Sequence, residues 1–224
     1  MTKSAKPAGP AGPAAQAPAK IELTPGRLGL MFAAAGLLGI LEVGALDFAY
    51  DKLGVPHRYF FGLLFASWIG SMLNLPLFTM APVEGEGPDA KPTVVAINVG
   101  GAIVPMLLSF WVISQQANPA PVLLSLLVVT GVTYLIATPV KGVGIAMPMF
   151  IPPLAAAGAA LVLAPTAPAA AAYAGGTLGA LLGADILNLP GIRTLGAPIV
   201  SIGGAGTFDG VFLTGLIAVL LAGA

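Results

Sequence analysis

The sequence predicts an all-α, polytopic membrane helix bundle with about seven transmembrane helices. Hydrophobic residues make up 57% of the 224 residues and charged residues only 8%, and the mean hydropathy is +0.96. A soluble domain carries about a quarter charged residues, so this chain could not cover a water-facing surface. Apolar runs of about 17–25 residues, long enough to cross a bilayer, recur along the chain. We therefore expect the lipid bilayer to surround most of it.

The first 26 residues are predicted to be a disordered cytoplasmic tail. They are rich in Pro and Ala and contain no apolar run. Such a segment cannot bury enough surface to offset the entropy of ordering. Residues 27–224 are predicted to form the transmembrane domain.

Seven apolar segments follow the tail, and each is expected to be a membrane helix. Their approximate ranges are 28–50, 60–80, 93–114, 121–139, 143–163, 171–190 and 197–222. Proline and glycine residues disturb several of them, which a membrane tolerates only where the freed backbone groups face protein or water. We expect the seventh helix to be broken at Gly203, Gly204 and Gly206, because three glycines in four residues disfavour a continuous helix.

The distribution of basic residues predicts the orientation. Seven of the nine lie in the tail or in alternate connections, namely Lys3, Lys6, Lys20, Arg27, Lys91, Lys141 and Arg193. Only Lys52 and Arg58 lie on the opposite side. The positive-inside bias then places the N-terminus in the cytoplasm and the C-terminus outside the inner (plasma) membrane.

Two stretches of the chain resemble each other and indicate an internal repeat. The hexapeptides 71–76 and 185–190 share Leu-Asn-Leu-Pro, and the small-residue stretches 98–102 and 201–205 follow them. The second and third segments would then correspond to the sixth and seventh. Such a three-plus-one-plus-three arrangement with parallel repeats is found among small transporters.

Four carboxylates lie inside the apolar segments with no Lys or Arg in those segments to neutralise them. They are Glu42, Asp47, Asp185 and Asp209. Intramembrane acids usually mark an ion path, a proton site or a catalytic site. Asp47 lies near the outer end of the first helix, where it could reach water. The alternative is that each acid is protonated and bonded between helices.

Asp185 and Asp209 are expected to meet if the glycines form an irregular backbone and the last helix begins near Thr207. Thr207 could cap that helix, whose dipole would favour an ionised Asp209. Asn188 is expected to line the same cavity as Asp185. Two such carboxylates can share a proton, or they can bind a cation or proton in an oxygen cage with Asn74, Asn98, Asn188 and Glu42.

The composition also excludes several function classes. The net charge is zero, so no nucleic-acid partner is expected. The absence of Cys excludes disulfides and thiolate sites. A single histidine, His57, argues against a His-based zinc site or a catalytic triad and is expected in an interfacial loop. No cofactor is expected, and the identity of any bound metal stays open.

Four motifs resemble a prokaryotic membrane family, domain of unknown function 1614. They are residues 98–102 (NVGGA), 142–146 (GVGIA), 183–185 (GAD) and 203–215 (GGAGTFDGVFLTG). The resemblance covers essentially everything after the tail and implies a membrane protein, but no activity.

A weaker likeness is to intramembrane aspartyl proteases of the presenilin type. They carry one Asp on a sixth helix and another after a Gly-x-Gly run on a seventh, which Asp185 and Asp209 match loosely. The chain departs from that scheme because Thr207 and Phe208 separate the glycines from Asp209. It also lacks a Tyr before Asp185 and the late Pro-Ala-Leu element.

The sequence therefore leaves three functions open. The leading hypothesis is transport or binding of a small solute, cation or proton at the intramembrane carboxylates. The first alternative is an aspartyl protease with Asp185 and Asp209 as catalytic residues. The second is a membrane scaffold or assembly subunit, and the chain could also form a homo-oligomer.

Overall fold

A computed structural model describes residues 25–81, 92–140, 144–192, 197–204 and 210–223. The predicted tail lies almost wholly outside the described residues, as do Gly206, Thr207 and Asp209. Residues 1–41 and 42–224 form two units by their internal contacts, and helix α1 (Pro25–Lys52) runs from the first into the second.

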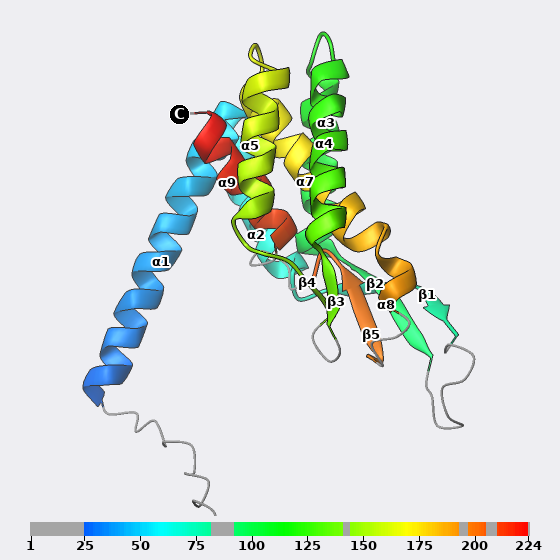
Figure 1. The fold of residues 1–224 in the computed structure, drawn as a ribbon. Helices are drawn as coiled ribbons and strands as arrows, with labels where there is room; N and C mark the ends of the chain where they lie inside the picture. The colour runs from blue at the N-terminus through cyan, green and yellow to red at the C-terminus, as the bar shows by residue number, and fades with distance from the viewer. Residues whose placement is uncertain (1–24, 82–91, 141–143, 193–196, 205–209, 224) are drawn as a thin grey trace, which may run out of the picture. The chain divides into compact units, whose positions relative to one another are not determined.

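Helices make up most of the second unit (Figure 1). The separate helices are η1 (His57–Tyr59), α2 (Phe60–Gly70), α4 (Ala120–Ile136), α5 (Ile151–Leu163) and α9 (Gly210–Ala222). The π-helical turn η2 (Val99–Ile103) continues into α3 (Val104–Ser114). A long helical stretch is divided into α6 (Pro168–Ala170), η3 (Ala171–Gly175), α7 (Gly176–Ala180), η4 (Leu181–Ile186) and α8 (Leu189–Ile192). Prolines lie in the first turns of α4 and α5, where their missing N–H is not needed.

In the part of the chain that the structure describes, five short strands form two small sheets. In the first, β1 (Asn74–Met80) pairs antiparallel with β2 (Thr93–Asn98), and β2 pairs parallel with β5 (Ile199–Ile202). Asn74 lies opposite Asn98, and Ala96 lies opposite Ser201. The second sheet is an antiparallel pair of β3 (Thr138–Val140) and β4 (Gly144–Ala146).

The strands correct the all-α prediction. The segments predicted as helices at 60–80, 93–114 and 197–222 are each part strand and part helix, and α5 begins only at Ile151 instead of near 143. In β2 the sequence TVVAIN is rich in β-branched residues, which favour a pleated strand. At the other strands Pro76 and Pro139 disfavour a helix because each lacks a backbone N–H.

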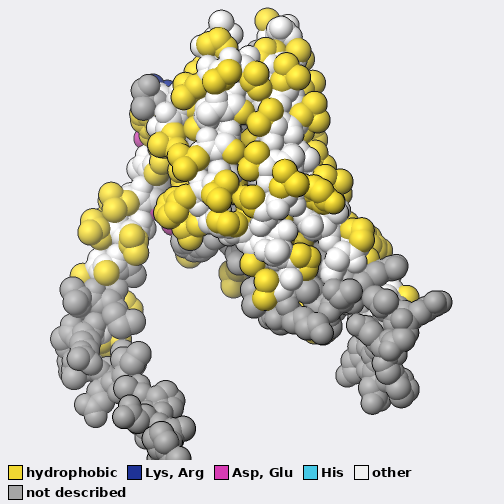
Figure 2. Space-filling view, viewed as in Figure 1, with side chains coloured by type: hydrophobic (Ala, Val, Ile, Leu, Met, Phe, Trp, Pro, Cys, Tyr) yellow, Lys and Arg dark blue, Asp and Glu magenta, His cyan; other side chains and the backbone are white. Residues whose placement is uncertain are grey.

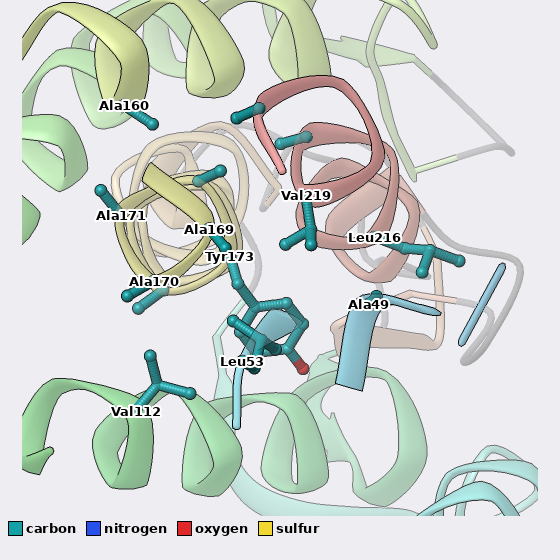
Figure 3. Close-up of a cluster of buried hydrophobic side chains, with 14 of the residues drawn as sticks. Ala49, Leu53, Val112, Ala160, Ala169, Ala170, Ala171, Tyr173, Leu216 and Val219 are labelled. Carbon is teal, nitrogen blue, oxygen red and sulfur yellow. The ribbon is translucent and has the colours of Figure 1, made fainter. Parts of the chain in front are cut away.

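The core of the helical part is built from small side chains. Ala169 to Ala172, Ala174 and Ala180 are buried in the long helical stretch, and Tyr173 projects among Ala49, Leu53 and Val219 (Figure 3). Helix α4 lies so close to this stretch that a Cβ added to Gly183 would lie 2.0 Å from Thr133 Oγ1. Close packing of small residues is how membrane helices associate.

The outer surface of the helices is apolar. Large side chains such as Trp68, Leu135 and Val162 are 61%, 80% and 76% exposed, and hydrophobic side chains cover the visible helices in Figure 2. Among the described residues, two helical stretches, Phe32–Lys52 and Pro168–Gly191, are long and apolar enough to cross a membrane, and four others are apolar but shorter. These features are consistent with a membrane protein. Seven spans and an internal repeat stay predictions.

Candidate functional site: a pocket at Asp185

Asp185 is positioned by the last turns of the long helical stretch and by a glycine from another part of the chain. It is half-buried in η4, and its Oδ2 accepts a hydrogen bond from the backbone N–H of Gly203, with an N–O distance of 2.8 Å. Gly203 has a φ of +75°, which favours glycine. A Cβ there would lie 2.7 Å from the backbone nitrogen of Ala102. The turn after β5 therefore packs tightly between Asp185 and η2.

A pocket of about 280 Å³ opens beside Asp185. Three parts of the chain line it: Ala184 and Asp185 of η4, Gly210 and Val211 of α9, and Ile145, Ala146, Met147 and Met149 in and after β4. Asp185 is the one charged side chain among these lining residues. The other residues in this lining are apolar or glycine.

The pocket also includes the residue that follows Asp209 in the chain. Gly210 begins α9 and lies on the pocket wall, while Asp209 itself lies outside the described residues. The backbone at the start of α9 therefore lies on the wall of the pocket that Asp185 also lines. Whether the two carboxylates meet stays a prediction.

Asn74 and Asn98 contact each other, but within the first sheet and not on the wall of the Asp185 pocket. Asn98 is 1% exposed, and its Nδ2 donates to Ser71 O at 2.8 Å and to Asn74 Oδ1 at 3.1 Å. Its Oδ1 accepts a hydrogen bond from the N–H of Gly101 at the start of η2, and Asn74 Oδ1 also accepts one from the Ser201 hydroxyl. The two amide protons of Asn98 therefore hold β2 to Asn74 of β1 and to Ser71, and its Oδ1 holds the start of η2.

Asn188 has a local structural role. Its Nδ2 donates to Gly183 O at 2.8 Å and so satisfies a carbonyl near the end of η4. The expectation that Asn188 shares a face with Asp185 assumes α-helical spacing, in which residues three apart are neighbours. The wider π-helical turn at residues 181–186 changes that spacing, and Asn188 is not among the residues that line the pocket.

Glu42 and Asp47 lie on α1 and do not line the Asp185 pocket either. Glu42 is half-buried. Asp47 is exposed, and its Oδ1 lies 3.4 Å from Nδ1 of His57, the first residue of η1. The sequence predicts an interfacial loop at His57 but gives no sign of its pairing with Asp47. No cluster of metal-ligating side chains occurs among the described residues.

Two contributions to the site have no clear sequence signal. One is the backbone N–H of Gly203, which sequence analysis treats only as a break. The other is the apolar wall formed by Ile145, Met147 and Met149. The motif at 142–146 lies within this region and could have drawn attention to it, although no residue type in it indicates chemistry.

The comparison with known proteins gives a family. A family model described as "Protein of unknown function (DUF1614)" matches residues 66–221, well over half of the chain. The chain belongs to this family. No curated protein and no solved structure matches it.

Proposed function

We propose that this DUF1614 member is a multi-pass protein of the plasma membrane, with its N-terminus in the cytoplasm and its C-terminus outside. Its pocket at Asp185 binds a small cation, a proton or a small cationic solute and takes part in its transport. The observation that carries this proposal is the carboxylate of Asp185, the one charged side chain among the described residues that line a pocket of about 280 Å³. That volume is near the lower end of small-molecule sites, which begin at about 300 Å³.

The surroundings of Asp185 favour a cation over an anion. The apolar wall weakens dielectric screening, so a charge opposite to that of the carboxylate is attracted more strongly than in water. The hydrogen bond from Gly203 fixes the orientation of the carboxylate before a ligand arrives. A fixed group loses less conformational entropy when it binds.

The parallel pairing of β2 with β5 supports a link to transporters with repeats. Each of these strands is followed by a glycine-containing stretch and then by an apolar helix, α3 or α9. The two strands that precede these helices therefore lie next to each other in parallel. Broken helices that meet at the interface of two repeats are common ion and substrate sites in transporters.

Transport can be tested in proteoliposomes with a panel of cations and metabolites, using flux assays and solid-supported-membrane currents. Asp185→Asn and Asp209→Asn should lower binding or flux at least about tenfold, because a hydrogen bond to a charged group contributes about 1.5–3 kcal/mol. Asp47→Asn is the matched control, since Asp47 is exposed and lies outside the pocket. Equal behaviour of the parent and both pocket variants for every solute would refute the proposal.

One observation favours a second candidate function, an intramembrane aspartyl protease. Gly210, the residue after Asp209, lines the same pocket as Asp185, as a catalytic aspartate pair would require. Cleavage of a transmembrane peptide should then disappear in both Asp185→Ala and Asp209→Ala and persist in Asp47→Ala. Cleavage that survives in either pocket variant would exclude this function.

A further inference from the structure

A second pocket, separate from the one at Asp185, lies between α2 and α3. It is a groove of about 740 Å³. From α2 and the residues before it, the lining comprises Val55, Pro56, Arg58, Tyr59, Gly62, Leu63 and Ala66, and from α3 it comprises Val104, Leu107, Leu108 and Trp111. This volume is typical of sites for small organic ligands. Arg58 is the one charged residue in the lining.

One end of the groove is closed by helix contact. A Cβ on Gly70 would lie 2.9 Å from Gly100 N, so α2 and η2 touch through their backbones. Ala66 and Val104 each lie about one helical turn from this contact. The groove therefore ends in apolar residues at the point where the two helices meet.

The other end of the groove is polar and aromatic. Tyr59 and Trp111 lie about three turns from the closed end along their helices, and Arg58 precedes Tyr59 in η1. The guanidinium carbon of Arg58 lies 4.8 Å from the centre of the Tyr59 ring. Arg58 forms no ion pair within the described part of the chain. Tyr, Trp and Arg in this combination are typical of residues at a membrane interface.

We propose that this groove binds an anionic phospholipid, with one acyl chain between α2 and α3 and the phosphate at Arg58. The occupant is amphiphilic because the groove is apolar at one end and cationic at the other. It is anionic because Arg58 lacks an acidic partner among the described residues, and its planar guanidinium matches a phosphate group. The proposal shares with the proposed function only the membrane location, and it does not depend on any ligand at Asp185.

Trp111 provides a probe of the groove. The chain has two Trp residues, and the other, Trp68, is exposed outside the groove. The full chain carrying Trp68→Phe can be reconstituted in phosphatidylcholine vesicles that contain a small fraction of brominated phosphatidylglycerol or brominated phosphatidylcholine. Bromine on the acyl chain quenches nearby indole fluorescence, so the apparent affinity for each lipid can be measured. We expect a preference for phosphatidylglycerol of about two- to fivefold, the range of an exposed ion pair.

Two pairs of variants separate the groove from the general surface. Arg58→Gln should abolish the preference for phosphatidylglycerol. Lys52→Gln removes a cation that lies outside the groove lining, so this variant should retain the preference. Gly62→Leu should weaken quenching by both lipids, because a Cβ at Gly62 meets open space on the groove wall. Gly131→Leu on α4 is its matched control, since a Cβ there also meets nothing within 4 Å.

Three results would overturn the proposal. The first is equal quenching by the two brominated lipids in the Trp68→Phe parent. The second is an equal loss of preference in Arg58→Gln and Lys52→Gln, which would indicate general surface charge. The third is quenching that depends on the protein-to-lipid ratio and not on the headgroup, which would mean that a second copy of the chain covers the groove.

Discussion

Replacing Gly203 with alanine should destabilise the protein by about 2–5 kcal/mol, the sum of a backbone and a packing effect. Gly203 has a φ of +75°, and a residue with a Cβ in this left-handed region costs about 1–2 kcal/mol. The new Cβ would also lie 2.6 Å from Ala102 Cβ and 2.7 Å from Ala102 N. Forcing a methyl group into such a close contact typically costs about 1–3 kcal/mol.

Gly54→Ala separates the two effects. Gly54 has nearly the same φ, +73°, but a Cβ there meets nothing within 4 Å. Its substitution should cost only the backbone contribution of about 1–2 kcal/mol. Ala102→Gly in the Gly203→Ala background should restore only part of the difference, because the contact with the Ala102 backbone nitrogen remains.

The free energies of unfolding can be measured by titrating SDS into mixed micelles and following helical circular dichroism. The reasoning would be refuted if Gly203→Ala were no more destabilising than Gly54→Ala. A second readout concerns Asp185, whose Oδ2 is bonded to Gly203 N. If the turn must move to admit the methyl group, binding at the Asp185 pocket should weaken in Gly203→Ala and remain unchanged in Gly54→Ala.

Two further predictions concern buried polar side chains, measured by the same unfolding assay. Asn98→Ala should lower the free energy of unfolding by about 2–4 kcal/mol, because it leaves the Gly101 N–H and the Ser71 carbonyl without their partner. Asn74→Ala, at an exposed position, should lower it by about 1 kcal/mol or less. Equal losses in the two variants would contradict the role given to Asn98. Thr177→Val should change stability by less than about 1 kcal/mol, because the buried Thr177 hydroxyl has no hydrogen-bond partner within the described residues. Thr133→Val should lower the free energy of unfolding by about 1–2 kcal/mol, since the Thr133 hydroxyl bonds to Val129 O and Gly179 O. A larger loss of stability in Thr177→Val than in Thr133→Val would contradict these hydrogen-bond assignments.

The centres of the helices could be predicted from the sequence, but the strands could not. Apolar residues at 60–70, 104–114 and 210–222 are helical as expected. The run at 93–98 is equally apolar, and a short apolar run does not distinguish a buried strand from part of a membrane helix. What makes it a strand is pairing with β1 and β5, and the partner in β5 is about 100 residues away in the sequence.

Asp185 could be proposed as a site residue from the sequence, but the groups that surround it could not. Asp185 is conspicuous in the sequence because a carboxylate in an apolar segment that contains no Lys or Arg is costly. The hydrogen bond that Asp185 accepts comes from the backbone N–H of Gly203. Every residue except proline has such a group, so the sequence does not single out this donor. The π-helical turn in η4 is likewise not evident from LLGADI, so the position of Asn188 relative to Asp185 was not predictable.

The pairing of β2 with β5 also constrains how the protein is made. Val94 pairs with Ile199, a separation of 199 − 94 = 105 residues, which a ribosome adding about 5–20 residues per second needs roughly 5–20 s to synthesise. Until β5 emerges, β2 has β1 on one side and an open edge on the other, and such an edge can pair with the strand of another chain. Helices α3, α4 and α5 and the stretch from α6 to α8 are synthesised during that interval and must leave this edge free. The sheet beside Asp185 is therefore completed late in biogenesis, and slower elongation between residues 98 and 199 prolongs the period in which nascent chains can aggregate.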